Sequence, residues 1–280
     1  MRLFAVLCWL LAFAAQPAWA ASSPLLQSLE RQLAWRISSE RGDVGIAALD
    51  LRTGELVGVN ADEAFPMAST VKIAVAANYL AQVEHGRRSL DDRIGGRSAA
   101  RLIEAMIVRS DNHATDVLMR DLGGPKLLQT WLEQNGIHGL RVDRNIDQLL
   151  RSRRDLRDVR DSTTPRAMVE LLRQLDSGRL LRPHSRSYLL GLMGRCVTGR
   201  NRIRGLLPAG TPVENKTGTL SGFTADVGFI TLPDGRRVAV AFFARGGTNR
   251  PRTIAEAARA IYDGFVYAWR SSFAAAYSSP

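Results

Sequence analysis

Residues 67–77 read Met-Ala-Ser-Thr-Val-Lys-Ile-Ala-Val-Ala-Ala, so Ser69 and Lys72 stand three apart at the start of an apolar run typical of a buried helix. Positions i and i+3 of a helix share a face, which would bring the Lys72 amine within hydrogen-bond reach of the Ser69 hydroxyl. A serine becomes nucleophilic when a base takes its proton, and an amine is such a base once burial and nearby cations lower its pKa. Unpaired N–H groups in the first helical turn would stabilise an oxyanion.

Two further motifs follow in chain order. Residues 110–112 read Ser-Asp-Asn between two helical segments, and residues 216–219 read Lys-Thr-Gly-Thr on a strand. Ser-x-x-Lys arises by chance about once in a chain of this length, whereas each later motif is expected only roughly a few hundredths of a time. Ordinary structural explanations exist for Lys72 as a solvated lysine, Ser110 as a loop hydroxyl, Asn112 as a helix cap and Thr217 as a strand residue. The three motifs together favour a catalytic interpretation.

With these motifs the chain resembles the serine penicillin-recognising enzymes, and within them the class A β-lactamases. The resemblance covers nearly the whole chain after residue 20. It includes Asp-Ser-Thr-Thr-Pro-Arg-Ala-Met at 161–168, similar to the segment that closes the family's omega loop, and Thr198-Gly199 before Arg202. It implies an α/β (α+β) fold of the β-lactamase/transpeptidase type. In that fold an antiparallel sheet flanked by helices adjoins an all-helical domain, with the active site between them.

Hydrophobic periodicity predicts the elements of such a fold. Leu25, Leu29, Leu33 and Ile37 recur every four residues in a helix expected over 24–41. Strands are expected at 44–51, 55–59, 211–216, 224–232 and 238–243, with largely helical patterns at 99–176 and 253–277. We therefore expect an α/β domain built from both chain ends, 21–63 and 205–280. The helical domain would span 64–204 and contain an omega-like loop at 143–164.

The resemblance gives each motif residue a role. Ser69 would be the nucleophile, Lys72 its base, and Ser110 the donor of a proton to the leaving nitrogen. Among the expected substrate-binding residues, Asn112 would bind the amide carbonyl, and Lys216 and Thr217 would bind the carboxylate. Gly218 is expected to lie against the substrate, because a side chain there would crowd a ligand. The N–H of Thr219 would form an oxyanion hole with that of Ser69. Arg202 matches an arginine that some family members use for the substrate carboxylate, and we prefer it to Arg204.

The chain departs from the family pattern in the omega loop. Family members carry Glu-x-x-Leu-Asn there, and the Glu positions the water that hydrolyses the acyl-enzyme. Residues 144–150 instead read Arg-Asn-Ile-Asp-Gln-Leu-Leu. If Arg144 and Leu149 are the matching residues, Ile146 replaces the Glu and Leu150 the Asn, and neither side chain handles a proton.

Other features of the loop are compatible with the family. Arg144 and Asp161 are expected to form the salt bridge that joins the ends of the loop. Asp143 or Asp147 would serve as a deacylation base only through a shifted register. The segment between Lys72 and Ser110 is shorter than is usual in class A enzymes, which affects one wall of the cleft.

Three functions remain open on this basis. The first is a class A β-lactamase that opens the β-lactam amide through a Ser69 acyl-enzyme. The second is a D-Ala-D-Ala peptidase, or penicillin-binding protein, that acylates but deacylates slowly. The third is a non-catalytic module that binds peptidoglycan or senses drugs, and it is the weakest because a binder does not need the relay of Ser69, Lys72 and Ser110.

The N-terminus predicts export. Arg2, an apolar run over 3–15 and Ala-Trp-Ala at 18–20 read as a secretory signal peptide over 1–20, so we expect a secreted, periplasmic protein. No later stretch predicts a membrane anchor. Cleavage would leave Cys196 as the only cysteine, and we expect it to be a buried structural thiol.

The formal net charge of +11 does not indicate nucleic-acid binding. The basic run at 151–154 continues into aspartates and lacks aromatic residues, so a solvated loop is the better interpretation. The four histidines are scattered without ligand spacing, so no metal or other cofactor is expected. The expected partner is a small β-lactam or a peptidoglycan stem peptide, with the protein acting as a monomer.

Overall fold

The computed structural model describes residues 23–38, 41–153 and 155–277. Its helices are α1 (Pro24–Ser38), α2 (Lys72–Glu84), α3 (Ala99–Val108), α4 (Asn112–Asp121), α5 (Pro125–Gln134), α6 (Ile146–Arg151), α7 (Pro165–Asp176), α8 (Pro183–Gly194) and α9 (Arg250–Tyr277), with 3₁₀ turns η1 (Ala68–Val71) and η2 (Ile203–Gly205). Its strands are β1 (Gly42–Asp50), β2 (Leu56–Val59), β3 (Phe65–Pro66), β4 (Arg93–Ile94), β5 (Arg97–Ser98), β6 (Ser162–Thr163), β7 (Val213–Leu220), β8 (Phe223–Thr231) and β9 (Arg237–Gly246).

The main sheet joins the two ends of the chain. Its strands run antiparallel in the order β2-β1-β9-β8-β7, with Ile46 of β1 opposite Phe242 of β9. Nearly every residue of β8 and β9 is buried, because helices cover both faces of the sheet. The strand β7 is left at one edge.

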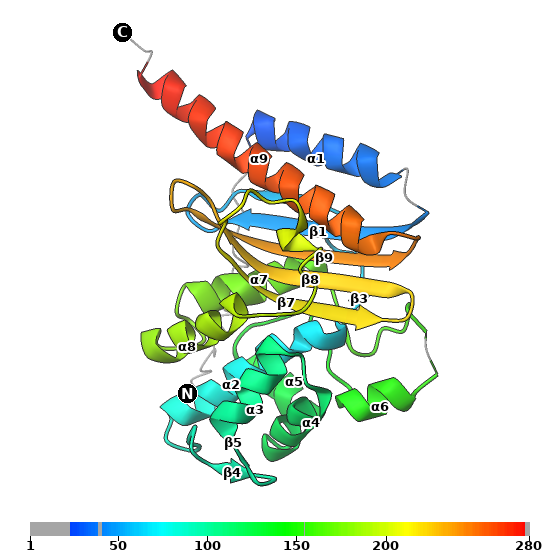
Figure 1. Cartoon of the computed structure of the whole chain (residues 1–280), viewed down its shortest axis with the longest axis vertical. Helices are drawn as coiled ribbons and strands as arrows, with labels where there is room; N and C mark the ends of the chain where they lie inside the picture. The colour runs from blue at the N-terminus through cyan, green and yellow to red at the C-terminus, as the bar shows by residue number, and fades with distance from the viewer. Residues whose placement is uncertain (1–22, 39–40, 154, 278–280) are drawn as a thin grey trace, which may run out of the picture.

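Helices α1 and α9 lie together over one face of the sheet (Figure 1). The α1 residues that enter this core are Leu26, Leu29, Leu33 and Ile37. Leu25, expected on the buried stripe, is 40% exposed, and Leu26 takes its place. A one-residue step turns a helix by about 100°, so adjacent leucines cannot both face the sheet.

The second core lies on the opposite face of the sheet. Helix α7 packs against β1, β8 and β9, and the remaining core helices group beyond it at the β7 edge (Figure 1). Helix α2 is at the centre of this group: residues 72–81 are all buried, which explains why its sequence is apolar on every face. The turn η1 at its start packs against β7.

The expected fold class is confirmed: an antiparallel sheet flanked by helices adjoins a group of helices. The strand predictions were short at 211–216 and 238–243, since β7 extends to Leu220 and β9 to Gly246. The signal peptide expected at 1–20 lies outside the described residues. Among the helices of the described segments, none combines the length and apolar character needed to cross a membrane.

Candidate active site

Ser69 and Lys72 occupy the junction of two helix types. Ser69 lies in the 3₁₀ turn η1 and Lys72 is the first residue of α2, and Ala68 before them has a positive φ of 47°. The expected hydrogen bond between Lys72 and Ser69 is not among the contacts of the described residues. Instead, the Lys72 amine donates to the Ser110 carbonyl at 2.8 Å and to Asn112 Oδ1 at 2.7 Å. The buried amine therefore points across to the loop before α4.

Ser110 lies between two ammonium groups. Its hydroxyl accepts hydrogen bonds from Lys72 Nζ at 3.3 Å and from Lys216 Nζ at 2.9 Å. Its φ is +59°, a strained conformation for serine, and it carries the hydroxyl into the space between α2 and β7. One hydroxyl thus connects the first and the third sequence motif, as a proton relay requires.

Burial and mutual repulsion change the acidity of the two lysines. Both side chains are fully buried. Burial, together with the positive charge of Lys216, lowers the pKa of Lys72 from 10.5 to about 7, although Asp111 and Asp116 oppose the change. Burial also lowers the pKa of Lys216, to about 8. Near neutral pH the Lys72 amine is therefore able to take a proton while Lys216 keeps its positive charge.

In the second motif, Asp111 and Asn112 make different contacts. Asp111 caps α4, because its carboxylate accepts from the N–H of Ala114 at 2.8 Å. Asn112, considered above as a possible cap, does not carry that contact. Asn112 is exposed, and its side-chain oxygen accepts from Lys72, which leaves its amide N–H₂ to point toward a ligand carbonyl.

The third motif lies on the edge strand β7. The hydroxyls of Thr217 and Thr198 are 2.6 Å apart, and Thr198 also approaches the buried Cys196 thiol at 3.3 Å. A side chain at Gly218 would meet the Met67 carbonyl at 3.0 Å and Ala68 Cβ at 3.2 Å. The glycine therefore also makes room for the turn that carries Ser69, while its expected role beside a ligand stays a prediction.

Arg202, and not Arg204, reaches the exposed end of β7. Its guanidinium donates to Thr219 Oγ1 at 2.8 Å and to the Gly218 carbonyl at 3.0 Å, and its Nε is buried without a partner. Arg204 instead donates to Asn215 and to the backbone near Val213, at the other end of the strand. Arg202 is thus the arginine beside the predicted substrate-binding residues.

Sequence reasoning missed Asp226, which supports this arginine. The carboxylate is fully buried and accepts from Asn215 Nδ2 at 2.8 Å and from the N–H of Ile203 at 3.2 Å. Burial raises the pKa of Asp226 to about 6. It joins the segment that carries Arg202 to the strand that carries Lys216, and its charge inside an otherwise apolar strand was the available signal.

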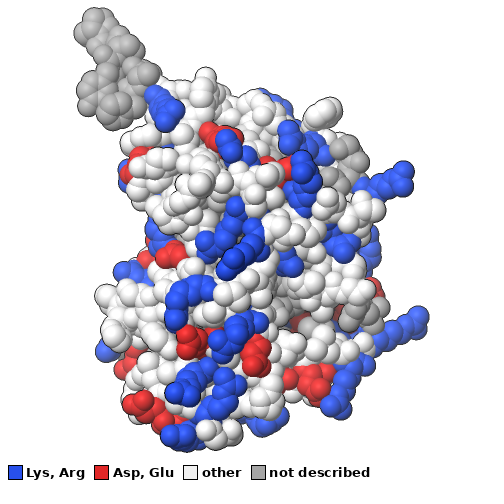
Figure 2. All heavy atoms as spheres, viewed as in Figure 1, with Lys and Arg blue, Asp and Glu red and all other residues white. Residues whose placement is uncertain are grey.

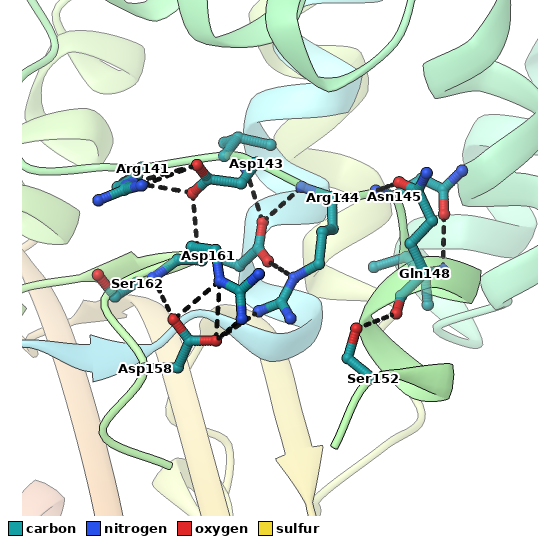
Figure 3. A network of polar contacts seen from close by, with 12 residues as sticks. Arg141, Asp143, Arg144, Asn145, Gln148, Ser152, Asp158, Asp161 and Ser162 are labelled. Atoms are coloured by element: carbon teal, nitrogen blue, oxygen red, sulfur yellow. Dashed lines mark hydrogen bonds and ion pairs between the residues drawn. The ribbon is translucent and has the colours of Figure 1, made fainter. Parts of the chain in front are cut away.

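The omega-like loop is closed by ion pairs (Figure 3). Arg144 Nε donates to Asp161 at 2.6 Å, and the same carboxylate accepts the backbone N–H groups of Asp143 and Arg144. The Asp161 carbonyl accepts from the N–H of Met67, two residues before the serine, at 2.9 Å. The expected Arg144–Asp161 salt bridge is present, and it ties the loop to the turn that carries Ser69.

The loop residues that matched the family's base and amide are apolar. Ile146 is buried at the first position of α6, and Leu150 is exposed. Asp147, the weak candidate for a base, is 54% exposed and pairs with Arg151 at 2.9 Å. This placement counts against Asp147 as a base, since its carboxylate is held on the solvent side of α6 by a neighbouring arginine. The whole segment 143–164 contains no glutamate.

Asp116 of α4 is a second residue that sequence reasoning missed. Its two carboxylate oxygens accept the N–H groups of Ile146 and Asp147 at 2.8 and 2.9 Å, so it caps α6 from another helix. The same carboxylate is close enough to raise the pKa of Lys72. In the sequence, its proximity to the site was indicated only by its position four residues, or one helical turn, after Asn112.

Metal ligation finds no support in the part of the chain that the structure describes. Within 23–38, 41–153 and 155–277 no group of three or more His, Cys, Asp or Glu side chains is placed to hold a metal ion.

Comparison with known proteins places the chain among β-lactamases. A family model described as the β-lactamase enzyme family matches residues 28–265. The extended-spectrum β-lactamase PER-1 of Pseudomonas aeruginosa is 30% identical across 86% of this chain and 88% of that protein. The carbapenem-hydrolyzing β-lactamase KPC of Klebsiella oxytoca is 30% identical across 80% of this chain and 84% of that protein.

Solved structures give the same result. A variant of the last common ancestor of Gram-negative bacteria class A β-lactamase is 35% identical, with a TM-score of 0.80 over 86% of this chain and 99% of that chain. The TLA-1 extended-spectrum β-lactamase is 26% identical, with a TM-score of 0.81 over the same shares of the two chains.

Proposed function

Because the chain belongs to the class A β-lactamase family, we propose that it is a serine hydrolase that opens the β-lactam amide through an acyl-enzyme on Ser69. The observation that carries the proposal is the Ser110 hydroxyl held between Lys72 and Lys216, because this arrangement delivers a proton to a leaving nitrogen beside the nucleophile. The natural partner is then a small β-lactam, bound without a cofactor.

Acylation follows from the groups present. The neutral Lys72 amine takes the proton of the Ser69 hydroxyl, and the oxygen attacks the lactam carbonyl carbon. The C–N bond then breaks, the lactam nitrogen takes the Ser110 proton, and the Lys72 ammonium restores that proton across their 3.3 Å contact. Lys216 and Thr217 bind the substrate carboxylate, while Arg202 adds positive charge beside Thr219.

Backbone groups supply the remaining stabilisation. We place the oxyanion between the N–H groups of Ser69 and Thr219, since η1 packs directly against β7. In an edge strand such as β7, the backbone N–H of every second residue points away from the neighbouring strand and is free to bind an oxyanion. Asn112 donates to the amide carbonyl of the substrate.

Deacylation is the slow half of the proposed reaction. It needs a base for water, and the loop offers Ile146 and Leu150 at the matching positions. The same observation favours a second candidate, a D-Ala-D-Ala peptidase that stays acylated by β-lactams. The two functions share the acylation machinery; they differ in the natural substrate and in the lifetime of the acyl-enzyme that a β-lactam forms.

One experiment separates the candidates. Purified protein is mixed with a chromogenic cephalosporin while product absorbance and intact protein mass are followed together. Sustained turnover supports the hydrolase, and a stoichiometric burst with a lasting adduct supports the peptidase. Ser69→Ala should abolish both signals, whereas Ser28→Ala on α1, a matched serine remote from the site, should leave them unchanged. Activity or adduct retained in Ser69→Ala would refute the proposal.

We also propose that the protein is exported and cleaved after Ala20, on the strength of the N-terminal sequence pattern. N-terminal sequencing of protein recovered from the periplasmic fraction tests this. A first residue of Ala21 is expected, and Met1 would contradict it.

A further inference from the structure

A basic cavity lies beside the loop that carries Ser110. It has a volume of about 570 Å³, and its lining includes Arg93, Arg97, Arg101, Arg109, Ser98 and Glu104. These residues come from the short hairpin of β4 and β5, from α3 and its N-cap, and from Arg109, which follows α3. In Figure 2 basic side chains, with acidic ones between them, cover the lower part of the molecule, where Figure 1 places this hairpin and α3.

The positive charge of this cavity is mostly uncompensated. Its one acidic residue, Glu104, pairs with Arg195 of a different segment at 3.0 Å. Within the described part of the chain, the one carboxylate paired with Arg97 is that of Asp111, at 3.9 Å. Among the described residues neither Arg101 nor Arg109 has an ion-pair partner. Many other arginines of this chain pair with a carboxylate at close range, as Arg88 and Arg166 do at 2.7 Å. The arginines of the cavity differ from these in lacking such a close pair.

The backbone adds to this field. Ser98 is the N-cap of α3, and its side chain accepts from the N–H of Arg101, so the positive end of the helix dipole lies at the cavity. Arginine presents a planar pair of donors that matches a carboxylate in a bidentate manner. Four such groups around one open space favour a ligand with a carboxylate.

The cavity borders the candidate active site through two direct links. Arg109 immediately precedes Ser110, and Arg97 reaches toward Asp111, the residue between Ser110 and Asn112. Asn112, the residue expected to hold the amide carbonyl of a substrate, follows in the same loop, three positions after Arg109.

We propose that this cavity is a subsite for a carboxylate on the acyl side chain of the substrate, beyond the amide that is opened. The proposal rests on the proposed function, and it makes the enzyme selective for acyl groups with a second negative charge. That charge comes either from a carboxylated β-lactam side chain or from a free carboxylate of a cell-wall peptide ending in D-Ala-D-Ala.

The test compares matched substrates. Benzylpenicillin and α-carboxybenzylpenicillin differ only by one carboxylate, and two D-Ala-D-Ala peptides with a free or an amidated side-chain carboxylate form a second pair. We expect the acylation rate constant at limiting substrate to favour the carboxylated member of at least one pair. In Arg101→Gln/Arg109→Gln this ratio should fall about threefold to tenfold, and in the wild type it should fall as ionic strength rises. The ratio cancels any general loss of active protein.

The control is Arg31→Gln/Arg36→Gln, which removes the same charge from α1 on the far face of the sheet. A ratio near one for both pairs, or an equal fall in the control, would overturn the proposal. Binding of phenylmalonate against phenylacetate, measured by calorimetry, gives a readout that needs no acylation. If the wild type prefers phenylmalonate yet no substrate acylates Ser69, the subsite stands and the proposed function fails. Equal binding of the two acids counts against the subsite.

Discussion

Replacing Lys216 by methionine should move the acid limb of acylation to higher pH. The pKa of Lys72 lies at about 7 instead of 10.5, which corresponds to about 5 kcal/mol of disfavour for the protonated amine. Burial contributes most and Lys216 contributes next. Both ammonium nitrogens bond the same Ser110 hydroxyl, so they are at most about 6 Å apart. At an effective dielectric constant of ~20 their repulsion is about 3 kcal/mol.

The sign of the effect follows directly. Without the neighbouring charge, Lys72 holds its proton more tightly, and the pH at which half of the amine is neutral rises by about two units. The alkaline limb, which in the wild type reflects loss of the Lys216 proton with a pKa of about 8, should disappear. The wild-type profile is therefore a bell with limbs near pH 7 and pH 8, and the variant profile rises once.

The assay is stopped-flow acylation by a chromogenic cephalosporin at limiting concentration, from about pH 5 to about pH 10, because the rate constant at limiting substrate reports the pKa values of the free enzyme. The positions of the limbs are compared and not the heights of the profiles, so the weaker substrate binding that follows from losing Lys216 does not enter the comparison. Lys216→Arg retains the cation and serves as the control, with its acid limb staying close to pH 7. An unmoved limb in Lys216→Met, or an equal shift in Lys216→Arg, would show that Lys216 does not set the acidity of Lys72.

Two further predictions concern the omega-like loop. Asp161→Ala leaves the nearly buried Arg144 without its partner and should lower the free energy of unfolding, measured by urea titration, by about 3 to 5 kcal/mol. Asp147→Ala breaks an exposed ion pair and should lower it by about 0 to 1 kcal/mol. Equal losses in the two variants would contradict this prediction. Ile146→Glu supplies a deacylation base but places a second carboxylate beside Asp116. The double variant Ile146→Glu/Asp116→Asn should therefore raise the deacylation rate, followed as loss of the acyl-enzyme mass, on the order of 10²-fold. Ile146→Glu alone should raise it less. Ile146→Gln with Asp116→Asn is the uncharged control, and equal acceleration there would exclude a base at this position.

Local patterns in the sequence were sufficient for much of the fold. Strands β1, β8 and β9 and helices α1, α2 and α9 follow from hydrophobic periodicity, which depends only on near neighbours along the chain. The same information erred over Leu25 and Leu26, because the four-residue repeat did not distinguish which of two adjacent leucines faces the sheet.

The contacts within the site were less predictable. Helical spacing suggested a bond between Ser69 and Lys72, whereas the amine turns to Ser110, 38 residues further along, and Ser110 in turn meets Lys216 across 106 residues. Such contacts depend on how elements pack and on the positive φ of Ser110, which the residue type does not reveal. The caps formed by Asp116 and the support from Asp226 were missed for the same reason: each joins segments that are remote in sequence.

The pairing of β1 with β9 determines when the main sheet can form during synthesis of the chain. β1 pairs with β2 soon after it along the chain, whereas its other partner, β9, begins at Arg237, so the sheet is completed only after most of the chain has been synthesised. Contacts this distant form slowly, since the entropy of closing a long loop is lost before any pairing is gained. Lys216 belongs to the same late group of strands. A nascent chain that has not yet reached residue 216 therefore carries Ser69 and Ser110 without the ammonium group that Lys216 places on the Ser110 hydroxyl.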